Sequence, residues 1–113
     1  MNMRAFSAQT GLTAHTLRYY EKLGLLNASG HRAFTTQDLE WVRFIVRLKD
    51  TGMSLDDILT YSRLRALGST TLASRQKMLE QHRDALRARI ENEQLHLVAL
   101  EAKIQHYQSL KPA

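Results

Sequence analysis

The sequence predicts a mainly α-helical protein, in which a small winged helix-turn-helix domain precedes one long helix that forms an antiparallel coiled coil. Three observations predict this class. Short amphipathic segments with capping residues fill residues 1–67, and residues 70–110 contain no glycine or proline. Within 70–110, leucine and isoleucine recur at the seven-residue spacing of coiled coils. We therefore divide the chain into a winged helix-turn-helix domain, 1–67, and a dimerisation helix, 70–110.

The segment TAHTLRYYEKLG, Thr13–Gly24, says most about function. It has the pattern of a helix that Thr13 caps and Gly24 ends. Four of its side chains recur at the spacing i, i+3, i+4, i+7 and share one face. Two permanent cations, an imidazole and a phenol suit phosphate oxygens and base edges. The four residues are His15, Arg18, Tyr19 and Lys22.

A short helix, Arg4–Thr10, and a turn at Gly11 precede this segment. A helix, a glycine-containing turn and a second, basic helix are typical of the helix-turn-helix motif, whose second helix enters the major groove of DNA. On its own, the basic face of one helix is more often a solvated surface, so this context is what favours DNA.

Residues 25–34 are too short for a helix and contain the turn residues Asn27, Ser29 and Gly30. They fit either two short strands around a turn, forming a small wing, or an ordinary loop. His31 and Arg32 lie near the tip, where either could reach a phosphate group.

Two further helices follow. Thr35 and Asp38 have the spacing of a capping box before a strongly apolar helix that ends near Asp50. We expect this helix to form the centre of the core, with Trp41 buried in it. After Gly52, a second capping pattern at Ser54 starts another helix, on which Leu55, Ile58, Leu59 and Ser62 share one face.

A helix over Thr71–Leu110 is about 60 Å long, more than the width of a small domain. Its apolar side chains fall on two registers of a heptad repeat, and nothing earlier in the chain could cover so long a stripe. A bare stripe exceeds the few hundred Å² of apolar patch that a monomer usually exposes. A homodimer is therefore predicted. Its interface comprises Leu72, Leu79, Arg83, Leu86, Ile90, Glu93, Leu97, Leu100, Ile104 and Tyr107.

The polar exceptions on this stripe predict the strand direction. A parallel dimer sets Arg83 against Arg83 and Glu93 against Glu93, and both pairs repel each other. An antiparallel dimer centred near Ala88 sets Arg83 against Glu93 and Leu72 against Ile104. We therefore predict the antiparallel arrangement.

Composition excludes several classes of function. The net charge of +5 favours a polyanionic partner, and the chain has no cysteine. Disulfides, thiolate metal sites and cysteine nucleophiles are thus excluded, and the five histidines lack the spacing of helical metal pairs. We expect no cofactor, no enzymatic activity and no membrane span. The lack of cysteine and of a secretion signal predicts a cytoplasmic location.

Three runs carry a resemblance to a known family. GLTAHTLRYYEKLGLL, then RxFTxxDLEWVRFI, then LKDTGMSLDDI resemble the MerR family of bacterial transcription regulators. The likeness covers roughly residues 4–67 and is closest to the short-chain branch that includes aldehyde-responsive members.

The resemblance implies a homodimer that binds a pseudo-palindrome in an over-long promoter spacer and bends and untwists it, bringing the promoter elements into phase for RNA polymerase. The recognition-helix contacts carried over from the family are Thr13, His15, Thr16, Arg18 and Tyr19. Arg32 matches the wing arginine, and Lys49 matches a lysine that contacts the DNA backbone.

This sequence departs from the family in three ways. The wing is several residues shorter than usual, and Phe34 replaces a tyrosine whose hydroxyl could reach phosphate. The branch's sensor cysteine falls near Val46, and this chain has none. Thiol and metal sensing are therefore not carried over, and the inducer is unknown. The alternatives are a repressor or architectural factor without an inducer, and a coiled-coil adaptor that binds only protein.

Overall fold

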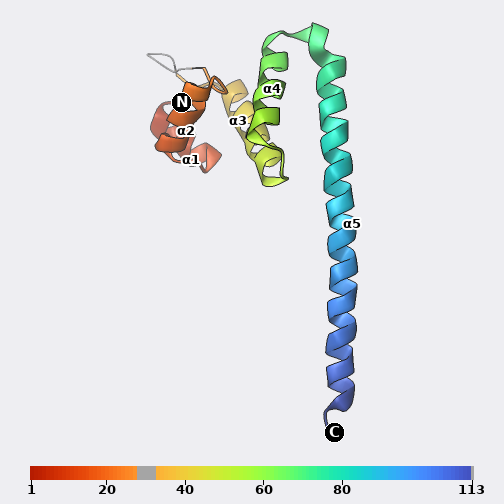
Figure 1. Ribbon diagram of the computed structural model, residues 1–113. Coiled ribbons are helices and arrows are strands. Elements are labelled where there is room, and N and C mark those ends of the chain that lie inside the picture. Colours follow the sequence, from red (N-terminus) through yellow and green to blue (C-terminus); the bar gives the residue numbers. More distant parts are fainter. Residues whose placement is uncertain (28–32, 113) are drawn as a thin grey trace. The chain divides into compact units, whose positions relative to one another are not determined.

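The structure is a computed structural model of the full chain, and it describes residues 1–27 and 33–112. In that part of the chain, one short 3-10 helix and five α-helices follow one another without any strand. Internal contacts divide the chain into two units, Met1–Arg75 and Gln76–Ala113. The helices, coloured in chain order in Figure 1, are α1 (Met3–Thr10), α2 (Ala14–Leu23), α3 (Thr36–Asp50), α4 (Leu55–Ala66) and α5 (Leu72–Leu110).

The sequence-based boundaries are confirmed wherever a capping residue set them. The Thr13 hydroxyl accepts the amide hydrogen of Thr16 and begins α2, and Gly24 ends the helix in the left-handed region at φ 81°. Thr35 and Asp38 form the predicted capping box, in which each side chain accepts the other residue's backbone N–H. Each cap satisfies backbone groups that a helix end leaves without partners.

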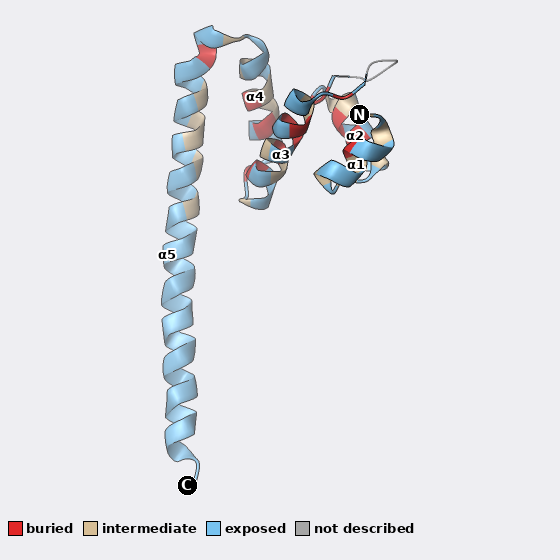
Figure 2. Ribbon diagram, turned by 180° about the vertical axis from the view of Figure 1, so that it is seen from behind, coloured by how far each residue is buried: buried red, intermediate tan, exposed pale blue. Residues whose placement is uncertain are grey.

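Helix α3 is the centre of the core, as predicted, and it packs against both α1 and α4. Its buried face, shown in red in Figure 2, contributes five side chains. The Trp41 ring stacks on Tyr61 of α4 with 6.1 Å between ring centres, while its indole N–H donates a 2.6 Å hydrogen bond to the Leu25 carbonyl. The buried residues of α3 are Leu39, Trp41, Val42, Ile45 and Leu48.

The face of α4 that carries Leu55 and Ile58 is only partly buried. Ile58 is buried, but Leu55 is 44% exposed, and Tyr61 takes the buried position instead. Tyr61 was missed because its burial depends on the Trp41 ring of another helix. The period of a single helix cannot reveal such a contact.

The predicted wing falls mainly outside the described residues, so its strands remain a prediction. On the side before the gap, Leu25 and Leu26 are buried. On the far side, the Phe34 ring stacks on Phe6 at 4.2 Å, and the Phe34 backbone exchanges two 2.7 Å hydrogen bonds with Met1. Both ends of the segment are therefore anchored to the helical core.

Helix α5 runs for 39 residues, which confirms the predicted long helix. Its first turn belongs to the first unit, because the Arg75 side chain bonds back to the Gly68 carbonyl at 3.1 Å and to the Thr71 hydroxyl at 3.0 Å. None of its residues is buried, and the helix is exposed over nearly its whole length in Figure 2.

Candidate nucleic-acid interface

The turn between α1 and α2 is held by side chains on both sides of Gly11. Gly11 adopts φ 74°, a conformation that is unfavourable for any residue with a Cβ atom. Its N–H donates to the Ser7 carbonyl at 3.0 Å. The Ser7 hydroxyl donates to the Leu12 carbonyl, and the Thr10 hydroxyl donates to the Phe6 carbonyl at 2.9 Å. The start of α2 is thus fixed relative to α1.

Helix α2 has one buried side and one exposed side. Leu17 is fully buried and Tyr20 is 6% exposed, so these two side chains fasten the helix to the core. The other side presents the four predicted residues, which we call the α2 face: His15, Arg18, Tyr19 and Lys22 are all exposed. Together with Leu23 they border an open hollow on the helix. The structure thus brings these four predicted residues together.

Thr13 and Thr16 are already engaged with each other. The Thr13 hydroxyl accepts the Thr16 N–H and donates to the Thr16 hydroxyl, with both distances at 3.1 Å. Each oxygen still has a lone pair for an outside donor, and the Thr16 hydroxyl hydrogen remains for an acceptor. The cap of α2 is therefore compatible with their predicted contacts with DNA, which remain a prediction.

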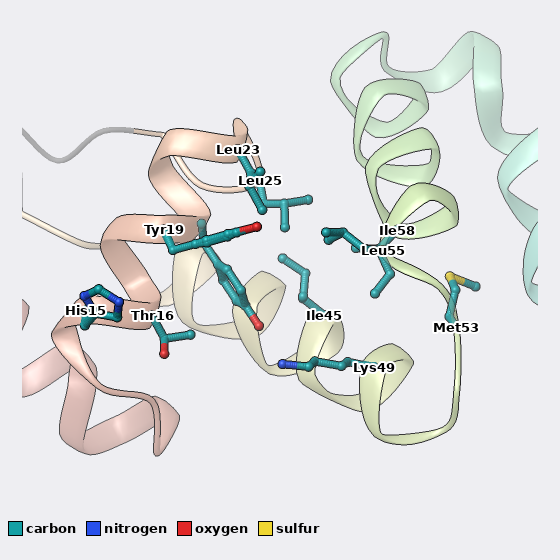
Figure 3. Close-up of a pocket in the computed structure, with 11 residues that line it drawn as sticks. His15, Thr16, Tyr19, Leu23, Leu25, Ile45, Lys49, Met53, Leu55 and Ile58 are labelled. Carbon is teal, nitrogen blue, oxygen red and sulfur yellow. The ribbon is translucent and has the colours of Figure 1, made fainter.

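Lys49 comes from the last turn of α3 and reaches the same region of the surface. Its exposed side chain borders one pocket together with His15, Thr16 and Tyr19 of α2. Figure 3 shows its nitrogen at the edge of this pocket. The predicted backbone-contacting lysine therefore lies close to the α2 face. Arg32, the predicted wing contact, lies outside the described residues.

The pocket lies between α2, α3 and the start of α4 and has a volume of about 470 Å³. Its interior is apolar, formed by side chains such as Ile45, Met53 and Ile58. Tyr20 also lines it; burial raises the pKa of its phenol above the ordinary value, and the negative charge of Asp50 adds to the shift. The sequence did not predict this pocket, because three helices contribute to its wall.

Sequence reasoning also missed one long-range polar contact that supports the helix-turn-helix. The Arg43 guanidinium of α3 donates to the Gln9 carbonyl of α1 at 3.1 Å. A basic residue on the outer arc of a buried helix gives no signal of its partner, so only the packed structure reveals this contact. It holds α1, and with it the turn into α2, against α3.

The predicted dimer interface lies on α5, and its residues are present as a row of accessible side chains. Leu72, Leu97 and Ile104 are each more than half exposed. Leu86, Ile90, Glu93 and Leu97 line a hollow along the helix. Arg83 forms a 3.1 Å ion pair with the neighbouring Asp84, so its predicted pairing with Glu93 of a second copy is not tested.

No group of three or more metal-ligating side chains gathers in residues 1–27 and 33–112. In the same ranges, no helix combines the length and apolar character needed to cross a membrane.

Family models match most of the chain. The model of the MerR HTH family regulatory protein matches residues 1–65, and the MerR DNA-binding model matches residues 39–96. An uncharacterised HTH-type transcriptional regulator of Haemophilus influenzae is 36% identical over 106 residues, which span 89% of this chain and 78% of that protein. The Bacillus subtilis regulator AdhR is 35% identical over 76% of this chain, and the match spans 65% of its own length.

Crystal structures agree with these matches. A protein from Listeria monocytogenes assigned to the MerR family superposes with a TM-score of 0.87 and 34% identity over 97% of this chain and 87% of its own. HiNmlR, described as a MerR family regulator lacking the sensor domain and bound to promoter DNA, gives a TM-score of 0.82 and 33% identity over 95% of this chain and 89% of its own. The chain belongs to the MerR family of DNA-binding transcriptional regulators.

Proposed function

We propose that the protein acts as a homodimer that binds a pseudo-palindromic promoter spacer, placing one α2 helix in the major groove of each half-site. The observation that carries this proposal is the convergence of Lys49 of α3 with the exposed face of α2 on one surface. A helix face that reads bases and a neighbouring cation that holds phosphate are the two kinds of contact that specific DNA binding requires.

Each contact residue has a separate role in this proposal. Arg18, exposed beside His15 and Tyr19 on the α2 face, reads a guanine edge in this proposal. Lys22 and Lys49 hold phosphate groups, which fix the register without reading the sequence. Thr13 and Thr16, at the start of α2, contact the DNA backbone. Arg32 is assigned to the wing on the family resemblance alone.

The exposure of α5 supports the proposed dimer. A helix of 39 residues with no buried side chain gains little from the single chain, so its apolar stripe needs a partner. Antiparallel pairing about Ala88 sets Leu79 against Leu97 and Arg83 against Glu93. Between residues 72 and 104 it leaves only Leu100 against Gln76 as a mismatch. Dimerisation also supplies the second α2 helix that a pseudo-palindrome requires.

Control of transcription then follows from DNA deformation. A dimer that bends and untwists the spacer changes how two promoter elements face RNA polymerase, at a cost of several kcal/mol of DNA strain. RNA polymerase is therefore a partner on the same promoter. A regulator that works on the chromosome belongs in the bacterial cytoplasm. A plain repressor or an architectural factor remains the second candidate, because this chain lacks the branch's sensor cysteine near Val46.

The test is footprinting and in vitro transcription on one template, the promoter upstream of the protein's own gene. Protection of an over-long spacer with increased transcription supports activation by deformation. Protection with reduced transcription favours the repressor. A loss of affinity by about 0.9 log units per phosphate contact for each tenfold rise in salt is expected in both cases. No protection at low salt, on this promoter or on random DNA, contradicts the proposal.

A further inference from the structure

We propose that the pocket between α2, α3 and α4 is a binding site for a small molecule with an apolar body and one anionic group. Its volume of about 470 Å³ falls within the range of roughly 300–1,000 Å³ that is typical of ligand sites. The pocket lies wholly within the first unit of the chain. None of its lining residues belongs to α5.

The interior determines the body of the ligand. Leu23 is the last residue of α2 and Leu25 follows the helix. Ile45 comes from α3, Met53 from the turn after α3, and Ile58 from α4. Figure 3 shows these side chains around one space. Methionine adapts its shape to a guest at low cost, and an apolar wall of this kind favours aliphatic or aromatic groups.

The edge determines the charge of the ligand. Lys49 is exposed at this edge and makes no ion pair within the described residues. His15 of α2 also borders the pocket. No carboxylate lines the pocket, although Asp50 follows Lys49 in the chain. A cation over an apolar interior therefore selects an anionic head group in preference to a cationic or neutral one.

Binding in the pocket bears on DNA, and this consequence rests on the proposed function. His15, Thr16 and Tyr19 form one wall from the same helix that presents the α2 face, and Lys49 is the proposed phosphate contact. An anion that occupies Lys49 competes with a DNA phosphate for the same charge. Occupation of the pocket is thus expected to weaken DNA binding.

The test follows the methyl group of Met53 by NMR in protein labelled with ¹³C-methyl methionine. Met53 lines the pocket, whereas Met78 lies on α5 and serves as the internal control. The probes are 8-anilinonaphthalene-1-sulfonate, which is anionic, and N-phenyl-1-naphthylamine, its neutral counterpart. We expect a saturable shift of the Met53 signal with one probe molecule per chain, and no shift of the Met78 signal.

Two variants test the pocket and its charge separately. Leu55→Trp fills the pocket from a side chain that is 44% exposed, and it should weaken both probes at least tenfold. Leu67→Trp, at a 70% exposed position outside the lining, should leave both affinities unchanged. Lys49→Gln should weaken the sulfonate at least fivefold and the neutral probe less than twofold. Far-UV circular dichroism checks that each variant is folded.

Several outcomes overturn the proposal: an unshifted Met53 signal, equal loss in the two tryptophan variants, or equal loss of both probes in Lys49→Gln. If the Met53 signal changes only with protein concentration, a second copy of the chain occupies the pocket, and the small-molecule proposal is wrong. The effect of pocket occupation on DNA binding is measured separately, by the anisotropy of a labelled DNA duplex with and without the sulfonate. If the protein binds no DNA even without a probe, the proposed function is contradicted. The NMR evidence for a ligand in the pocket is unaffected by that result.

Discussion

Arg18 is the residue on the α2 face with the most specific assignment. It is exposed and makes no ion pair in the part of the chain that the structure describes, so its five donors are available to DNA. Arg18→Ala should therefore cost about 1–3 kcal/mol of affinity for the operator, the value of a good bidentate contact with a base. Fluorescence anisotropy with labelled operator DNA at fixed salt measures this loss.

The matched control is Arg63→Ala, which removes the same charge from the exposed surface of α4. It should change affinity much less than Arg18→Ala does, because a distant charge adds only to the long-range field. Equal affinities of Arg18→Ala and the wild-type protein, or equal losses in the two variants, would show that Arg18 does not read DNA.

Tyr20 couples stability to alkaline pH. Burial first, and the charge of Asp50 second, raise the pKa of its phenol in the folded protein above the value near 10 expected in the unfolded chain. The unfolded state therefore loses the proton first, and the stability that the neutral phenol contributes is full below pH 10. It is lost as the pH rises through the folded-state pKa.

Tyr20→Phe removes this coupling, so the variant should lose less stability than the wild-type protein between pH 8 and pH 10.5. Urea denaturation followed by circular dichroism gives both free energies. Tyr19→Phe, at a position that is 43% exposed, is the control and should keep the wild-type loss. A Tyr20→Phe variant with an unchanged pH dependence would assign the alkaline loss to other groups.

At the level of elements, local signals predicted the helices well. The caps at Thr13, Thr35 and Ser54 act through backbone groups three residues away, so a short window contains all the relevant information. Contacts between helices were predicted poorly. The Trp41 hydrogen bond to Leu25 and the exposure of Leu55 depend on which elements meet, and helical periodicity does not encode that.

The candidate site divides in the same way. The α2 face was predictable because helical spacing alone gathers its four residues on one side. The proximity of Lys49 to that face was implied by family resemblance and not by spacing, because Lys49 reaches it from α3. The pocket behind the face was not predicted at all, since no stretch of sequence contains its wall.

Thr13 has both a structural and a proposed binding role, and three substitutions separate them. Thr13→Ala removes the cap of α2 and should destabilise the fold by about 0.5–2 kcal/mol. Thr13→Asp keeps a capping oxygen and adds a negative charge that the helix N-terminus tolerates, so stability should stay near that of the wild-type protein. That charge repels phosphate, so operator affinity should fall. Thr13→Ser should preserve both properties.

Urea denaturation and anisotropy on the same preparations give the two quantities. An Asp variant that binds DNA as tightly as wild type would remove Thr13 from the proposed interface. An Ala variant as stable as wild type would show that the 3.1 Å bond from the Thr16 N–H contributes little.

At the scale of the whole molecule, the α2 face and the apolar stripe of α5 both call for a second copy of the chain. In the proposed complex one α2 helix reads one half-site, and in the single chain α5 leaves its apolar stripe exposed. A second copy would complete both, since the proposed antiparallel pairing buries the stripe and supplies another α2 helix. In the proposed dimer, each of the two units, Met1–Arg75 and Gln76–Ala113, therefore has its own role.

Cysteine cross-linking tests both the direction and the register of the coil, because the natural chain has no cysteine. In the predicted alignment Leu79 of one copy faces Leu97 of the other. A protein carrying both Leu79→Cys and Leu97→Cys should therefore oxidise to a covalent dimer, seen on a non-reducing gel and lost on reduction. The two positions are about 27 Å apart along one helix, so no bond can form within a chain.

The single variants provide the contrast. In an antiparallel coil centred near Ala88, Leu79→Cys alone has no cysteine opposite it and should remain a monomer on the gel, and so should Leu97→Cys. A parallel coil would place each substituted residue against its own copy, so both single variants would cross-link. Cross-linking of the singles would therefore reverse the proposed direction. If neither the singles nor the double variant cross-links, the register is wrong, because disulfides tolerate only a few ångströms of misalignment between Cβ atoms.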